Sequence, residues 1–103
     1  MKINIKYEND VATAFLTGEI DHHSAKEIRS QLDSYIIAAQ PEVFAIDLSG
    51  ITFMDSSGVG LILGRSRLLQ ECGGRLEIIN PQPYIKRVLR LAGIDVKLGM
   101  RNV

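Results

Sequence analysis

A chain of 103 residues, of which 46% are hydrophobic and 23% charged, has the size and apolar content of one globular domain. Its twelve basic and twelve acidic residues cancel, and its few aromatic residues cannot form a stacking platform, which argues against a nucleic-acid partner. No apolar run is long enough to span a bilayer. The single cysteine, Cys72, excludes an intrachain disulfide and a cysteine-based metal site, so we expect a cytoplasmic protein.

The first half of the chain predicts two strands, a helix and a third strand. Residues 3–7 and 11–17 have the composition of strands and are separated by the turn signal Asn9-Asp10. The spacing of Ser24 and Glu27 is that of a capping box, which predicts a helix beginning at Ser24. Its apolar residues recur at helical spacing and Pro41 ends it; they are Ala25, Ile28, Leu32, Ile36 and Ala39. The apolar run 43–48 is typical of a buried central strand.

The second half predicts two more helices and two more strands. A helix follows Asp55 and stops at Gly73-Gly74, with an apolar face of Val59, Ile62, Leu63, Ser66 and Leu69. Residues 76–79 form the next strand, and Pro81 and Pro83 precede a helix with an apolar face of Ile85, Val88, Leu89 and Ala92. Residues 96–98 predict an edge strand. The order β-β-α-β-α-β-α-β predicts an α/β fold, a mixed and mostly parallel sheet of four to five strands with helices packed on it.

The segment 55–60, Asp-Ser-Ser-Gly-Val-Gly, carries the most informative chemistry. It lies between a buried strand and a helix, at the edge of the sheet where open α/β sheets place their sites. Capping explains an aspartate or a serine there. It does not explain two hydroxyls and two glycines in six residues, because each glycine costs a helix about 1 kcal/mol relative to alanine. We therefore expect Ser56 and its neighbours to do more than start a helix.

Other chemistry for this region is less well supported. Ser56 has no Gly-x-Ser-x-Gly context and no identified base, although the adjacent pair His22-His23 could lie near it. A metal site made of Glu19, Asp21 and these two histidines would need neighbouring side chains to converge from an extended segment. Gly58-x-Gly60 lacks the lysine and the third glycine of a phosphate-binding loop. We therefore expect no catalytic residue, no metal and no cofactor.

Two segments carry a family resemblance. Residues 16–25, Leu-Thr-Gly-Glu-Ile-Asp-His-His-Ser-Ala, and residues 53–65, which begin Phe-Met-Asp-Ser-Ser-Gly, resemble the anti-sigma factor antagonists of the STAS-domain family. The likeness covers nearly the whole chain. The Asp-His-His element resembles the corresponding segment in the sporulation branch of the family. The resemblance implies a single STAS domain over residues 1–103. It also implies a final helix after the last strand, for which this sequence has no counterpart before Val103.

The resemblance implies a partner-switching function. An unphosphorylated antagonist binds an anti-sigma factor that is also a serine kinase and releases the sporulation sigma factor; phosphorylation reverses this, and a PP2C-type phosphatase restores binding. By motif position, Ser56 is the phosphoacceptor. The implied partner-binding residues are Asp21, His22, Asp55, Ser57, Gly58, Gly60, Leu61 and Arg65. The alternatives are a STAS scaffold subunit of a stress-signalling assembly and a weak nucleotide-binding domain, and the sequence leaves a weak homodimer open.

Overall fold

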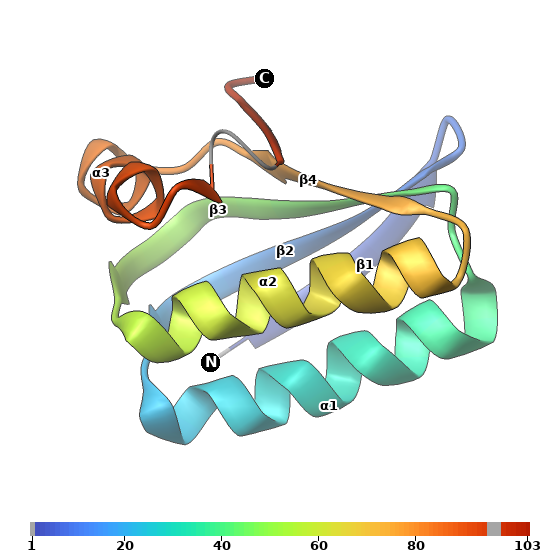
Figure 1. Cartoon of the computed structure of the whole chain (residues 1–103), viewed down its shortest axis with the longest axis horizontal. Helices are drawn as coiled ribbons and strands as arrows, with labels where there is room; N and C mark the ends of the chain where they lie inside the picture. Colours follow the sequence, from blue (N-terminus) through green and yellow to red (C-terminus); the bar gives the residue numbers. More distant parts are fainter. Residues whose placement is uncertain (1, 95–97) are drawn as a thin grey trace.

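The structure, a computed structural model, describes residues 2–94 and 98–103. Its elements follow the predicted order: β1 (Lys2–Glu8), β2 (Val11–Ile20), α1 (His22–Ala39), β3 (Val43–Met54), α2 (Ser56–Glu71), β4 (Arg75–Ile79), α3 (Pro83–Leu91) and β5 (Gly99–Arg101). The strands form one sheet in the order β1-β2-β3-β4-β5 (Figure 1). β1 pairs with β2 antiparallel, and each later pair of neighbours is parallel, so the predicted α/β fold with a mixed, mostly parallel sheet is confirmed.

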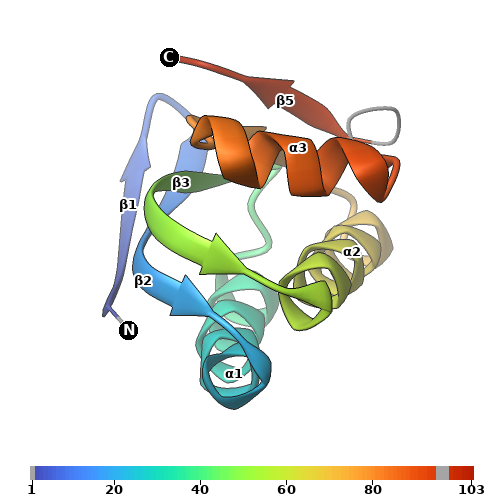
Figure 2. The same ribbon diagram turned by 90° about the vertical axis from the view of Figure 1, so that its left-hand side faces the viewer.

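The three helices occupy two places around this sheet. α1 and α2 lie side by side and contact β2, β3 and β4, whereas α3 contacts β3 near its carboxyl end (Figures 1 and 2). The core between the layers is mostly aliphatic, and its largest fully buried side chains include Phe44, Leu16 and Met54. The starts of α1 and α2 lie together at one end of this helix pair (Figure 2).

Two strands are longer than the sequence predicted. β2 continues to Ile20 and β3 to Met54, whereas the predicted strands were residues 11–17 and the apolar run 43–48, which Ser49-Gly50 follows. The pairing of β2 with β3 passes through register irregularities on either side of Thr17 and Gly18. A side chain at Gly50 would come within 2.8 Å of the Leu16 carbonyl oxygen, so glycine here permits a close approach between strands and does not end one.

The start of α1 also differs from the prediction. The N-cap is Asp21, and the helix begins at His22, so the box predicted from Ser24 to Glu27 is wrong. Ser24 is instead the third residue of the helix. Its side chain accepts a hydrogen bond from the Asp21 amide at 3.0 Å, and the Asp21 carboxylate accepts one from the Ser24 amide at 2.9 Å. The capping box exists, but aspartate begins it and serine closes it.

The predicted helix faces hold only in part. Ile28, Leu32 and Ile36 of α1 are buried as expected, whereas Ala39 is exposed. In α2 the predicted apolar face did not include Leu61 and Arg65, which are both buried. In α3, Ile85 and Leu89 are buried, whereas Ala92 is exposed. The last described strand is β5, whereas most of the strand predicted at 96–98 lies outside the described residues.

Candidate functional site

The register of β2 against β3 brings two helix starts together. Ile20 pairs with Met54, the last residues of the two parallel strands, and each strand is followed at once by an aspartate that caps a helix. The amide of Asp55 donates a hydrogen bond of 3.2 Å to the Ile20 carbonyl, which fixes the second cap against the end of β2. Asp21 and Asp55, far apart in sequence, therefore sit at neighbouring positions.

The start of α2 leaves Ser56 free. The Asp55 carboxylate accepts a hydrogen bond from the Ser57 amide at 2.8 Å. Ser56, the first residue of the helix, is exposed, and no described residue forms a hydrogen bond with its hydroxyl. Ser57 is half-buried and points into a pocket between the helices. Of the two serines, Ser56 has the hydroxyl that a large partner can reach.

Gly58 is a packing residue at the base of this helix start. It is buried, and a side chain on it would collide with Cγ of Met54 and come within 3.1 Å of Cγ2 of Ile20. The absence of a side chain lets the first turn of α2 lie directly on the ends of β2 and β3. The structure gives Gly58 a part in placing Ser56, and its predicted contact with a partner stays a prediction.

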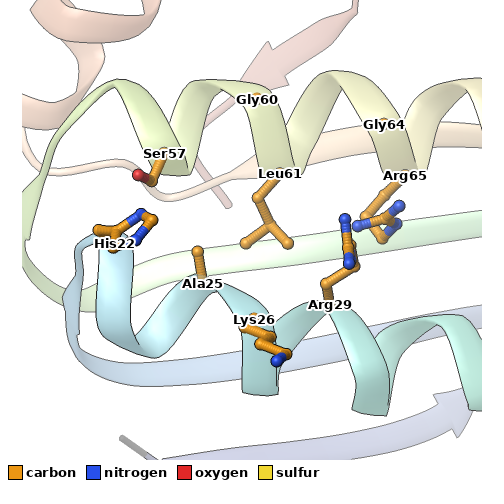
Figure 3. Close-up of a pocket in the computed structure, with 9 residues that line it drawn as sticks. All are labelled: His22, Ala25, Lys26, Arg29, Ser57, Gly60, Leu61, Gly64 and Arg65. Carbon is orange, nitrogen blue, oxygen red and sulfur yellow. The ribbon is translucent and has the colours of Figure 1, made fainter.

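A pocket of about 390 Å³ lies between α1 and α2 (Figure 3). We call it the interhelix pocket. Its nine lining residues are His22, Ala25, Lys26, Arg29, Ser57, Gly60, Leu61, Gly64 and Arg65. Five of them were predicted partner-binding residues. The sequence analysis missed Ala25, Lys26 and Arg29 on α1 and Gly64 on α2; the cations Lys26 and Arg29, three residues apart on one helix, were the signal.

Arg65 is the most buried charge of the interhelix pocket. The residue is 8% exposed, and its Nε lies 2.7 Å from Oδ1 of Asp33, although the alignment is not that of a hydrogen bond. Its Nη1 is buried and has no hydrogen-bond partner among the described residues. Burial lowers the pKa of Arg65, the charge of Asp33 opposes that change, and the nearby Arg29 adds to it. The two arginines therefore repel each other, and the Asp33 carboxylate forms its ion pair with Arg65.

Asp21 lies on the other side of the α1 start. It lines a separate acidic hollow together with Glu19 and Glu27, and hydrogen bonds from the Ser24 and His23 amides hold its pKa below its usual value. Among residues 2–94 and 98–103, no three histidine, cysteine or acidic side chains gather as metal ligands. Within the same ranges no helix is long and apolar enough to cross a membrane.

Comparison with known proteins agrees with this architecture. The STAS domain family matches residues 2–103. The anti-sigma F factor antagonist of Paenibacillus polymyxa is 35% identical over 94 residues, which cover 91% of this chain and 80% of that protein. The antagonist of the same name from Lysinibacillus sphaericus is 40% identical over 79 residues, 77% of this chain and 68% of that protein. The chain belongs to the STAS-domain family of anti-sigma factor antagonists.

The same comparison extends to solved structures. The STAS domain described here superimposes on the anti-sigma factor antagonist SpoIIAA in its unphosphorylated form with a TM-score of 0.85 and 30% identity, over 99% of this chain and 88% of that one. The phosphorylated form of the Bacillus cell fate determinant SpoIIAA gives a TM-score of 0.77 and 30% identity, over 99% of this chain and 91% of that one. The STAS fold is therefore shared with both states of SpoIIAA.

Proposed function

We propose that this STAS domain is a phosphorylation-controlled antagonist that, when unphosphorylated, binds an anti-sigma factor kinase and frees a sporulation sigma factor. The observation that carries the proposal is the placement of Ser56. Its hydroxyl is exposed, bears no hydrogen bond among the described residues, and lies at the first position of a helix whose cap is Asp55. A kinase can reach this oxygen without disturbing any contact that holds the fold.

The chemistry of a phosphate at Ser56 accounts for a switch without a change of fold. The phosphate adds about −1.5 to −2 charges, and free amides and the dipole at a helix start favour that charge within the protein. At a contact surface the same charge lies beside the Asp55 carboxylate. A partner that accepts a neutral hydroxyl there would meet two neighbouring anions. Like-charge contacts of this kind cost several kcal/mol, and about 4 kcal/mol is a thousandfold in affinity.

The proposed docking surface surrounds Ser56 on two helices. Asp21 and His22 supply its α1 edge, and Asp55, Ser57 and the exposed part of the first turns of α2 supply the rest. A PP2C-type phosphatase would remove the phosphate by reaching the same exposed position. The domain itself supplies no catalytic group in this scheme, since the kinase and the phosphatase carry out the chemistry.

The phosphoacceptor is tested by ATP-dependent labelling with the anti-sigma factor kinase of the same organism. Labelling should disappear in Ser56→Ala and persist in Ser57→Ala, because only the first hydroxyl is exposed at the helix start. The opposite pattern would move the acceptor by one residue. Incubating the labelled domain with the PP2C-type phosphatase should release the phosphate and restore kinase binding.

The electrostatic switch is tested by affinity. Ser56→Ala should bind the kinase about as tightly as the natural domain, whereas Ser56→Asp should bind at least about tenfold more weakly. The two variants have small side chains at an exposed position, so their folds should be equally stable. Equal affinities for both would show that a negative charge at this position does not prevent docking.

A further inference from the structure

The interhelix pocket has an excess of positive charge. Lys26 and Arg29 line it from α1, and Arg65 lines it from α2, whereas none of its nine lining residues is acidic. Asp33, which does not line the pocket, is already paired with Arg65, with its Oδ1 2.7 Å from the Arg65 Nε. Figure 3 shows the heads of Arg29 and Arg65 facing each other from the two helices. Two like charges so placed favour an anion between them.

Arg65 has hydrogen-bonding capacity that the domain leaves unused. The side chain is 9% exposed, and its Nη1 lies buried without a partner among the described residues. A buried donor without an acceptor destabilises a fold unless something else accepts its hydrogen bond. Carboxylate oxygens match the forked donors of a guanidinium group. The buried end of the pocket therefore has the chemistry of a carboxylate site.

Packing within the domain does not require glycine at two positions of α2 that line the interhelix pocket. A side chain added to Gly60 or Gly64 would meet no atom within 4 Å, in contrast to Gly58. Both lie inside α2, where glycine is the poorest helix former apart from proline. They stand one helical turn apart and expose the helix backbone. Such a surface suits the close approach of another backbone.

From these two observations we infer that the interhelix pocket receives an acidic segment of a protein partner, with a carboxylate between Arg29 and Arg65 and its backbone against Gly60 and Gly64. The inference rests on the proposed function, in which that partner is the anti-sigma factor kinase. A small anion would account for the arginines alone. A peptide segment accounts for the arginines and the glycines together, because its carboxylate can lie at the arginines while its backbone lies against the glycines.

The charge part of the inference is tested by titrating the full chain with the kinase in a calorimeter. Arg29→Glu should weaken binding at least about tenfold, because it places an anion where the partner's carboxylate sits. Arg67→Glu is the matched control: it makes the same charge change on an exposed arginine that does not line the interhelix pocket, and it should change affinity by no more than about twofold. The difference between the two variants should shrink as salt is added.

The glycine part is tested with Gly60→Ala/Gly64→Ala. This double variant should unfold at a higher temperature than the natural domain, because alanine is the better helix former and meets no neighbour. It should nevertheless bind the kinase at least about tenfold more weakly, since the two methyl groups hold the partner's backbone away. A loss of stability would show that the glycines serve the fold, and unchanged affinity would show that no backbone lies against them.

The class of ligand is tested by nuclear magnetic resonance with synthetic probes. Hexaglutamate should shift the amide signals of Gly60 and Gly64, whereas hexaglutamine should not. A response to ATP or inorganic phosphate but not to hexaglutamate would overturn the acidic segment and assign the pocket to a phosphate-bearing ligand. If the natural domain binds the kinase and Arg29→Glu binds equally well, the inference is wrong and the proposed function stands. If the natural domain does not bind the kinase, the proposed function fails.

Discussion

The two helix starts at the end of the sheet use the same residue types differently. Each begins with an aspartate cap directly after a strand, and each has a serine within its first turn. In α1 the serine at the third position, Ser24, closes a capping box and also donates a hydrogen bond of 2.8 Å to the Glu19 carbonyl. In α2 the third position is Gly58, and no box forms.

This difference separates serines that hold the fold from serines that are free to react. The Ser24 hydroxyl accepts a hydrogen bond from the Asp21 amide and donates one to the Glu19 carbonyl. The Ser56 hydroxyl is engaged with nothing among the described residues, while a single hydrogen bond to the Ser57 amide completes the cap at Asp55. At the start of α2 the Asp55 amide is bonded to the Ile20 carbonyl instead of to a third-position side chain, and the Ser56 hydroxyl takes no part in the cap.

The sharpest way to break the comparison is to give α2 the third residue of α1. Gly58→Ser should lower the free energy of unfolding by about 2 kcal/mol, because the new side chain meets Met54 and Ile20 in a filled space. Gly60→Ser is the matched control and should be neutral or slightly stabilising, since its side chain meets nothing. Urea unfolding measures both. A stabilised Gly58→Ser would mean that packing does not keep this start open.

The reverse change on α1 should have a smaller effect. Ser24→Ala removes two hydrogen bonds of the cap and should cost about 1 kcal/mol. Ser56→Ala and Ser57→Ala should each stay within about 0.5 kcal/mol of the natural domain, because neither hydroxyl holds another group. Chemical unfolding of the three variants side by side checks this. Similar losses in all three would remove the distinction between structural and free serines.

Phosphorylation should have a smaller effect still, and of opposite sign. A phosphate on Ser56 lies at the start of α2, where negative charge is favourable, and should raise the free energy of unfolding by about 0.3 to 1 kcal/mol at low salt. Comparing the unfolding of the phosphorylated and unphosphorylated domains measures it. The shared fold of both SpoIIAA forms agrees with a phosphate that leaves the architecture intact. A large destabilisation would instead indicate a switch that acts through the fold.

The sequence predicted the order of elements because periodicity and turn residues report on local structure. It misplaced the end of β3 because Ser49-Gly50 has turn composition, and only the partner strand shows that Gly50 serves a close approach. It misplaced the start of α1 because Ser24 and Glu27 fit one capping box and Asp21 and Ser24 fit another. Tertiary pairing at the end of β2 decides between the two.

The residues of the candidate site also fall into two groups, those that the sequence singled out and those that it did not. The sequence singled out the segment around Ser56 because two hydroxyls and two glycines within six residues are unusual for a helix start. The sequence did not single out Lys26 and Arg29 of the interhelix pocket, because they look like an ordinary solvated face until α2 is packed beside them. Arg65 was expected as a contact residue, whereas its burial and its ion pair with Asp33 of α1 arise only when the two helices pack together.

The smallest predicted effect is a pH dependence of stability that arises at Asp21, the cap of α1. Amide hydrogen bonds from Ser24 hold the pKa of Asp21 below its ordinary value of 3.8. A carboxyl whose pKa is lowered by folding stabilises the fold fully above its ordinary value, and this stabilisation is lost as the pH falls through the lowered one. The chemical shift of the Asp21 carboxyl carbon should thus titrate below pH 3.8. Against Asp21→Asn, the natural domain should be more stable near neutrality, and the difference should shrink as that carboxyl is protonated. A midpoint at or above the ordinary value would mean that the box in α1 is open in solution, and that the two helix starts differ less than their hydrogen bonds indicate.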